Sequence, residues 1–241
     1  MTGLDGAPGE DGVNSPATNT GQDGASGSGS PGWFSNTCKC AAKGQPGAAG
    51  VSGGTDGLDG TGGGSPPWLV LNVNTFKIVP TGGYINIKSR GGGGGDGGKG
   101  GKGGDGAPGG NAGTNVASCI KKGSCQPGQG GRGGAGAPGG QGGRGGSGGN
   151  GGSIVVNYVE DKFVDRIVPD IDAGSAGDPG DPGDGGKGGK GGRNEIFPPG
   201  SAQTMAPNGD PGAVTGNKGS GTVGNPGTYK IRKVSQLPPT N

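Results

Sequence analysis

Histidine is absent from this sequence, and large apolar side chains are scarce. None of the 241 residues is His, aromatic residues make up 4% and hydrophobic residues 25%. Without His, a Ser-His-Asp triad and a His general base are excluded. A chain of this length normally folds into one or two domains around packed side-chain cores. Too few apolar side chains are present here to build such cores.

Neither sign of charge predominates, and long apolar runs are also lacking. The formal net charge is +2, from 20 Lys and Arg against 18 Asp and Glu, which generates no strong field for nucleic acid. No apolar run is long enough for a transmembrane helix, so we expect no membrane insertion. The opening residues MTGLDGAPGEDG have neither the basic nor the apolar region of a signal peptide. We therefore expect a processed chain, or one that leaves the cell by another route, for example in a virion.

Glycine and proline make up an unusually large share of the sequence. The chain has 71 Gly and 20 Pro, or 91 of 241 residues, whereas average usage of the two together is roughly 12%. Three classes of protein fit this composition: disordered low-complexity chains, collagen-like chains, and folds that pack through the backbone.

A three-residue period distinguishes among these classes. In 91–110, glycine fills nearly all of two lines out of three, and the third line carries every charged residue. The same period returns in 130–151 and 174–192, with shorter runs elsewhere, including 3–12. The packing glycines predicted from it are Gly94, Gly97, Gly100, Gly103, Gly130, Gly133, Gly136, Gly139, Gly142, Gly145, Gly148, Gly174, Gly177, Gly180, Gly183, Gly186 and Gly189. The predicted outward charged stripes are Asp96, Lys99, Lys102, Asp105, Arg132, Arg144, Asp178, Asp181, Asp184, Lys187, Lys190 and Arg193.

Polyproline II geometry explains such a period, because it has three residues per turn and makes no internal hydrogen bonds. Buried runs must then bond to neighbouring runs, and close approach requires stripes without a Cβ. Collagen also needs Gly at every third position, but here the phase breaks repeatedly and strand-like segments interrupt it. Disorder remains the simple alternative. We favour a polyglycine-II (PPII) helix bundle or sandwich with little or no α-helix and a few short β-strands.

The apolar residues gather in three segments between the glycine runs. The first contains Trp68, Val70, Phe76 and Ile78, the second contains Ile154, Val156 and Tyr158, and the third begins near Tyr229. Alternation in these segments predicts short strands, which we expect to form a cap with the only side-chain core. The predicted organisation is one cooperative domain with glycine-rich runs at 1–65, a β segment at 66–90, central runs at 91–152 with a Cys loop at 119–125, a β segment at 153–173, further runs at 174–227 and a terminal strand at 228–241.

The four cysteines are Cys38, Cys40, Cys119 and Cys125, and four cysteines allow three pairings. A bond between Cys38 and Cys40 is sterically awkward. We prefer two cross-links between 37–41 and 118–126; a local bond between Cys119 and Cys125 is the alternative. Disulfides suit a fold without a large core and are typical of oxidising compartments. A zinc site is disfavoured because the spacings are wrong and His is absent.

Motifs of catalysis and cofactor binding are missing. In GGKGGKGG a glycine follows each Lys, so a phosphate-binding loop is excluded. The stripe Asp178, Asp181, Asp184 lacks the clustered oxygens of a calcium site. The GGRGG segments at Arg132 and Arg144 have no interleaved aromatics for RNA binding. We therefore expect no enzymatic activity, no cofactor, no metal and no nucleic-acid partner.

Two groups of proteins resemble this chain. Triplets such as GAPGGNAG, GQPGAAG and GTDGLDG, together with four Cys, resemble snow flea antifreeze proteins, which are disulfide-stapled bundles of polyproline II helices. That resemblance implies an ice-binding face, for which only 48–61 and 213–222 are sufficiently neutral. The glycine-rich runs also resemble those of the tip adhesins of T-even-like phage tail fibres, in which a polyglycine-II sandwich presents loops to the bacterial surface.

These observations predict a non-enzymatic extracellular or virion structural protein. Opposite charges at Asp96 and Lys99, and at Asp184 and Lys187, could set a register between copies. The expected partners are further copies of the chain, in a homo-oligomer or fibre, or a cell-surface ligand. Ice binding and host-receptor binding by a phage adhesin are the alternatives.

Overall fold

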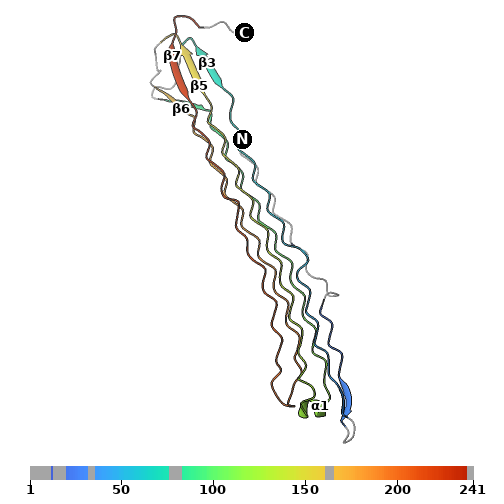
Figure 1. Cartoon of the computed structure of the whole chain (residues 1–241). Coiled ribbons are helices and arrows are strands. Elements are labelled where there is room, and N and C mark those ends of the chain that lie inside the picture. The colour runs from blue at the N-terminus through green and yellow to red at the C-terminus, as the bar shows by residue number, and fades with distance from the viewer. Residues whose placement is uncertain (1–11, 13–19, 32–35, 76–82, 161–165, 238–241) are drawn as a thin grey trace.

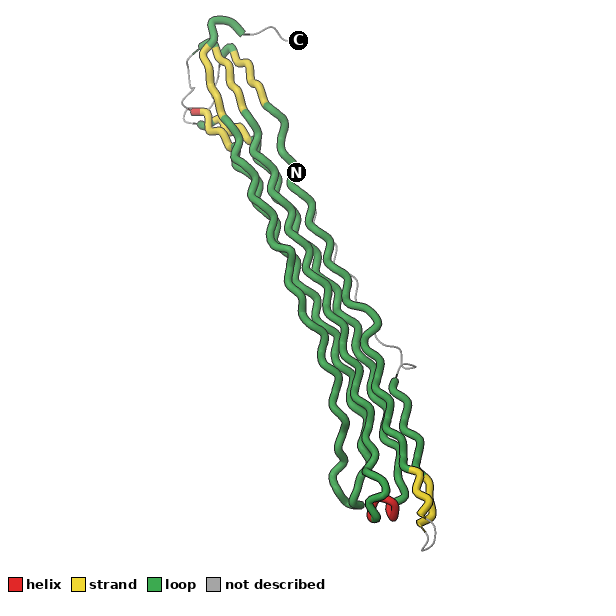
Figure 2. Tube along the Cα trace, in the orientation of Figure 1, coloured by secondary structure: helices red, strands yellow, loops and turns green. Residues whose placement is uncertain are grey.

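The protein is a long rod with different structures at its two ends (Figure 1). In this computed structural model, helices and strands of the described residues lie at the ends, and the shaft between them is extended chain (Figure 2). The near absence of helix and the few short strands expected from the sequence are both confirmed. The described residues are 12, 20–31, 36–75, 83–160 and 166–237. Most of the expected run at 3–12 and the expected strand positions Phe76 and Ile78 lie outside them.

The shaft is built from extended runs that bond side by side. In the described part of the chain these are run 1 (20–27), run 2 (41–65), run 3 (91–115), run 4 (128–152), run 5 (171–193) and run 6 (206–227). Along most of each contact, the N–H of every third residue donates to a carbonyl oxygen of the neighbouring run. The bonds between runs satisfy backbone groups that an extended run cannot satisfy internally.

The runs form two layers, with runs 1, 3 and 5 in one and runs 2, 4 and 6 in the other. Within a layer neighbouring runs are parallel, because Gly94 donates to Ser175 and Gly97 to Asp178. Between layers neighbouring runs are antiparallel, because the residue number of the acceptor falls as the residue number of the donor rises. Gly95, for example, donates to Thr61, and the next bond of that ladder runs from Gly98 to Leu58.

One contact contains a single extra residue. Ala107 of run 3 donates to Ala48 of run 2, whereas Gly104, one triplet earlier, donates to Ser52. Run 2 therefore advances four residues where run 3 advances three, and Val51, which is 59% exposed, lies at this step. The three-residue period of glycines shifts by one residue between Gly50 and Gly54, and the stretches on either side of this shift form one run.

The connections at one end of the rod include a β-hairpin and a helix. Strands β1 (Ser28–Pro31) and β2 (Asn36–Lys39) are antiparallel and join run 1 to run 2. Helix α1 (Ala117–Lys121) lies between runs 3 and 4, and 194–205 joins runs 5 and 6. We call this end the stapled end, because both disulfides lie there. No helix of the described residues has the length and apolar character needed to cross a membrane.

At the other end each layer continues as a parallel β-sheet. Strands β3 (Leu69–Val73), β5 (Ile154–Tyr158) and β7 (Tyr229–Lys233) follow runs 2, 4 and 6 and pair in the order β3-β5-β7. Strands β4 (Ile85–Lys88) and β6 (Ile167–Asp170) precede runs 3 and 5 and pair with each other. We call these five strands the cap.

A small side-chain core lies between the two sheets of the cap. Ile87, Ile154, Val156 and Ile167, from β4, β5 and β6, are buried, and partly buried apolar residues of β3, β4, β7 and the start of run 5 pack against them. The period along the chain changes here from three to two, because successive side chains of a strand alternate between its faces. Alternation therefore turns one face of each sheet toward this core and the other outward.

Candidate functional site

The predicted packing glycines lie where runs meet. A Cβ added at any of them would come within 2.4 Å of a carbonyl oxygen of a neighbouring run, and real Cβ atoms do not approach so closely. At Gly100, for example, the added Cβ would lie 2.2 Å from the Gly140 oxygen. The backbone, together with small side chains such as those of Ala107 and Ala137, thus forms the interior of the shaft.

The charged residues of the predicted stripes lie on the outer surfaces of the two layers. Lys102 and Asp105 are half-buried, and the other stripe residues are exposed. Runs 3 and 5 carry ten of them on the surface of one layer: Asp96, Lys99, Lys102, Asp105, Asp178, Asp181, Asp184, Lys187, Lys190 and Arg193. Arg132 and Arg144 of run 4 lie on the surface of the other layer. The Lys102 ammonium lies 2.9 Å from the Asp105 carboxylate.

Several outward side chains also bond to the backbone of the next run. The Asp96 carboxylate accepts the N–H of Asp178 at 2.8 Å. Such bonds, which we call side-chain rungs, satisfy outward N–H groups that no backbone carbonyl reaches. Equivalent rungs join Asp105 to Lys187, Asn111 to Arg193, Asp56 to Gln141, Asp59 to Arg144, Ser65 to Asn150 and Asn150 to Asn225. These carboxylates and amides therefore link runs in addition to making the surface polar.

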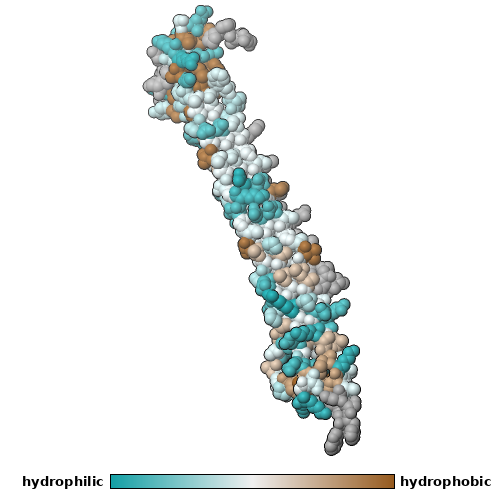
Figure 3. Space-filling model, in the orientation of Figure 1, coloured by the Kyte–Doolittle hydropathy of each residue, from teal (hydrophilic) through white to brown (hydrophobic). Residues whose placement is uncertain are grey.

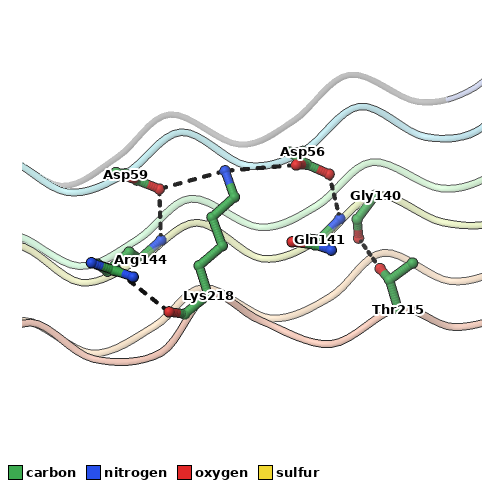
Figure 4. Close-up of polar contacts among 7 residues, drawn as sticks. All are labelled: Asp56, Asp59, Gly140, Gln141, Arg144, Thr215 and Lys218. Carbon is green, nitrogen blue, oxygen red and sulfur yellow. Dashed lines mark hydrogen bonds and ion pairs between the residues drawn. The ribbon is translucent and has the colours of Figure 1, made fainter.

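A polar cluster crosses the layer of even-numbered runs near its middle (Figure 4). Lys218 of run 6 lies over run 4, and its ammonium is 3.6 Å from Asp56 and 3.7 Å from Asp59 of run 2. The Arg144 side chain donates to the Lys218 carbonyl. The Arg144 N–H and Lys218 both lower the pKa of Asp59, and the backbone hydrogen bond has the larger effect. At Asp105 the pKa is lowered first by the bond from Lys102 and then by the Lys187 N–H.

Run 6 departs from the glycine pattern at this cluster. Its ladder onto run 5 steps from Gly212 to Gly221. Between them, the Thr215 hydroxyl donates to the Gly140 carbonyl, and the Lys218 N–H donates to Gly142 on run 4. Thr215 and Lys218, which stand where the pattern would place glycine, thus bond to run 4 of their own layer and not to run 5.

Runs 5 and 6 form one long edge of the shaft, and proline interrupts its donor lines. From Gly133 onward, each residue of run 4 that follows an acceptor for run 2 donates its own N–H to run 6. The equivalent line in run 6 consists of Asn208, Pro211, Val214, Asn217, Ser220, Val223 and Pro226. In run 5 the corresponding line includes Pro179 and Pro182. Because proline lacks an N–H and Val214 and Val223 project outward with exposed fractions of 64% and 68%, this edge is a poor surface for another run.

Two disulfides join the hairpin to the segment around α1. Cys38 is bonded to Cys119, and Cys40 is bonded to Cys125. Both therefore connect the two segments that we expected to be cross-linked. The first encloses a sequence separation of 81 residues and the second 85, so they fix the run 1–run 2 connection against the run 3–run 4 connection.

Glu195 organises the rest of the stapled end. One carboxylate oxygen accepts the Asn115 N–H at 2.6 Å, and the other accepts the Asn115 side-chain amide and the Gly128 N–H, both at 2.7 Å. The Asn115 side chain, which is buried, also accepts the Ala41 N–H. The sequence analysis singles out neither residue, although both continue lines of packing glycines: Asn115 is six residues after Gly109, and Glu195 is three residues after Gly192. Their position where the glycine runs end was the available signal.

The outer face of sheet β3-β5-β7 presents a mixed surface. Trp68, just before β3, is 71% exposed and Val70 is 49% exposed. The parallel register aligns Val70 with Val155 and Lys230, and Asn72 with Asn157 and Arg232. The outward positions of these strands carry no Asp or Glu. Figure 3 shows hydrophilic and hydrophobic residues side by side at this end of the rod.

The two neutral stretches do not form one surface. The stretch 48–61 lies in run 2 and 213–222 lies in run 6, on either side of run 4. Each stretch also contains charged residues: Asp56 and Asp59 lie in the first and Lys218 in the second, and their ion pairs span the space between the two stretches. A metal site is not evident either: the described residues contain no group of three or more Cys, Asp or Glu side chains placed to hold an ion.

Comparison with known proteins identifies no family. No family model and no curated protein matches this chain. Among solved structures, the chain is similar to the nine polyproline type II helical bundle springtail antifreeze protein from Granisotoma rainieri, with 24% identity over 88% of this chain and 97% of that chain. The TM-score is 0.10, and a likeness this low supports no conclusion about fold or function.

Proposed function

We propose that this protein is a non-enzymatic extracellular rod that holds its cap away from its point of attachment, so that the cap adheres to a surface. The observation that carries the proposal is the contrast between the two ends. The stapled end is closed by two disulfides. The cap exposes Trp68 and Val70 on the sheet that carries Lys230 and Arg232, and it exposes Tyr84 just before β4 of the other sheet.

In this proposal the six runs are polyglycine-II helices. The bonds between runs recur at every third residue, as expected of a helix with three residues per turn. At about 3.1 Å per residue, the 25 residues of run 3 would extend roughly 75 Å. Bonds to neighbours in both layers would make such a shaft stiff along its length.

The edge formed by runs 5 and 6 favours a single rod over a fibre that grows laterally from that edge. Edge groups that remain unpaired invite association, and proteins block them with proline and bulky or charged residues. Pro179, Pro182, Pro211 and Pro226 take such positions on runs 5 and 6. Sedimentation velocity tests this point: we expect an elongated monomer, and concentration-dependent fibres would support self-assembly instead.

An orientation experiment tests the adhesion. A biotin-acceptor peptide is inserted at Gly200, in the turn of the stapled end where the structure leaves open space, or is attached after residue 241, downstream of β7. Beads coated in the two orientations are then offered to bacterial, plant and animal cells. We expect adhesion only when the stapled end is attached to the bead and the cap is free. Equal adhesion in both orientations, or none in either, would refute the proposal.

Ice binding is a second candidate, favoured by one observation. The edge line of run 6 from Asn208 to Pro226 carries no charged residue, and uncharged regular surfaces suit ice. Thermal hysteresis with faceted ice crystals would support this candidate. Freezing and melting at the same temperature would exclude it and would leave the adhesion proposal unaffected.

A further inference from the structure

The outer face of sheet β3-β5-β7 combines three kinds of group in a fixed array. An apolar column runs along β3 through Trp68 and Val70, and a basic column runs along β7 through Lys230 and Arg232. Between them the Asn157 amide donates to the Asn72 carbonyl at 2.8 Å. The opposite face of the same strands packs on the cap core, so this array stands on a sheet whose inner face is buried.

We infer that this face binds an acidic polysaccharide. This inference rests on the proposed adhesive function and names its ligand class. The ring of Trp68 is 71% exposed and offers an apolar surface for the C–H groups of a sugar ring. Arg232 can bind a carboxylate or sulfate group in a bidentate manner, and Lys230 adds a second positive charge.

The amide pair adds hydrogen-bonding groups for hydroxyls. The bond between Asn157 and Asn72 uses one N–H of the first and one lone pair of the second. The carbonyl oxygen of Asn157 and the NH₂ group of Asn72 retain the capacity to bond to a ligand. A sugar hydroxyl is both donor and acceptor, and it can therefore bond to both groups.

Dimensions and charge favour a polysaccharide over other polymers. The β3 and β7 columns are two strand spacings apart, about 9.6 Å, which is roughly the width of two sugar rings. A flat face with two positive charges is too weakly basic for strong binding to nucleic acid. Of the acidic side chains near the cap, Asp170 of β6 and Asp172 of run 5 lie against Arg90 in the other layer. Glu160, two residues after β5, accepts a hydrogen bond from the Thr75 hydroxyl.

Binding of the full chain to heparin and to polygalacturonate tests the inference, with dextran as the neutral control. In about 0.15 M salt we expect binding to at least one acidic polymer and none to dextran. Trp68→Ala and the double variant Lys230→Gln/Arg232→Gln should each weaken binding by about tenfold or more. The double variant Lys187→Gln/Lys190→Gln removes the same charge from the shaft and should change affinity by less than about twofold.

Each opposite result would overturn the inference. Equal binding to dextran, or no binding to either acidic polymer, would contradict the ligand class. An equal loss of affinity in the shaft variant would contradict the location of the site. Binding only to phosphatidylserine vesicles would indicate a membrane ligand. The thermal midpoint of each variant is compared with that of the unaltered protein to check that the fold is intact. If beads bearing Trp68→Ala with a free cap still capture cells normally, the cap adheres through another surface, and only the ligand assignment fails.

Discussion

The ammonium group of Lys218 lies 3.7 Å from the carboxylate of Asp59, although run 4 separates their two runs. The side chain of Lys218 is 33% exposed and that of Asp59 is 56% exposed, so solvent screens the pair. We expect Lys218→Met to lower the free energy of unfolding by less than about 1 kcal/mol. Denaturant unfolding at low and high salt measures this. A loss that exceeds this limit and does not depend on salt would show that Lys218 has a packing role.

Gly100→Ala should destabilise the shaft strongly, because the added methyl would meet the Gly140 oxygen. Overpacking of this kind costs about 1–3 kcal/mol or more. Gly216→Ala is the matched control, since its Cβ would meet nothing within 4 Å. Lys99→Ala, at an exposed position, should also be near neutral. Equal tolerance of all three changes in thermal unfolding would contradict packing through glycine stripes.

Acid should destabilise the protein through Asp59 and Asp105. Their pKa values are lowered in the folded protein from the ordinary 3.8, so the unfolded chain binds more protons as pH falls. The stabilisation is then complete above the ordinary carboxyl pKa and is lost as pH falls through the folded-state values. We expect a thermal midpoint that is level down to about pH 5 and falls below it.

The double variant Asp59→Asn/Asp105→Asn provides the comparison for acid unfolding. Its amide oxygens can still accept the N–H groups of Arg144 and Lys187, but they do not titrate. The fall of the midpoint between about pH 5 and pH 2 should therefore be shallower than in the unaltered protein. An unchanged slope would assign the acid sensitivity to other carboxylates.

Glu195→Gln should weaken the stapled end. The carboxylate accepts three hydrogen bonds, and a Gln side chain would turn its NH₂ group toward one of these donors. Hydrogen bonds to a charged group contribute about 1.5–3 kcal/mol each, so we expect a loss of that order. Asp181→Asn, on the exposed stripe, is the control. Similar unfolding curves for the two variants would refute the role of Glu195.

Reduction should loosen the stapled end before the cap. Each disulfide contributes about 2–5 kcal/mol in proteins of this kind, and both lie at the end far from β5. Hydrogen exchange in reductant should rise first around Cys119 and Cys40 and later at Ile154 and Val156. A uniform increase along the rod would show that the molecule unfolds as a single unit.

Much of the local structure could be predicted from particular residues. The alternation of Ile154, Val156 and Tyr158 indicates a strand, and these residues lie in β5. The spacing of Asp178, Asp181 and Asp184 indicates one exposed line, and all three are exposed. By contrast, Trp68 just before β3 and Arg232 of β7 are far apart in the sequence, and only the register of the sheet places them on one face.

The three-residue period is a local property, because the backbone geometry of each run decides which side chains point inward and which point outward. The neighbours of a run are not local, since every glycine stripe is equally able to accept another. Which runs become neighbours depends on the tertiary structure. It is fixed by the lengths of the connections, by the disulfides Cys38–Cys119 and Cys40–Cys125, and by the register that the sheets and runs share. The rung from Asp96 to Asp178 and the position of Lys218 beside Asp59 depend on that selection.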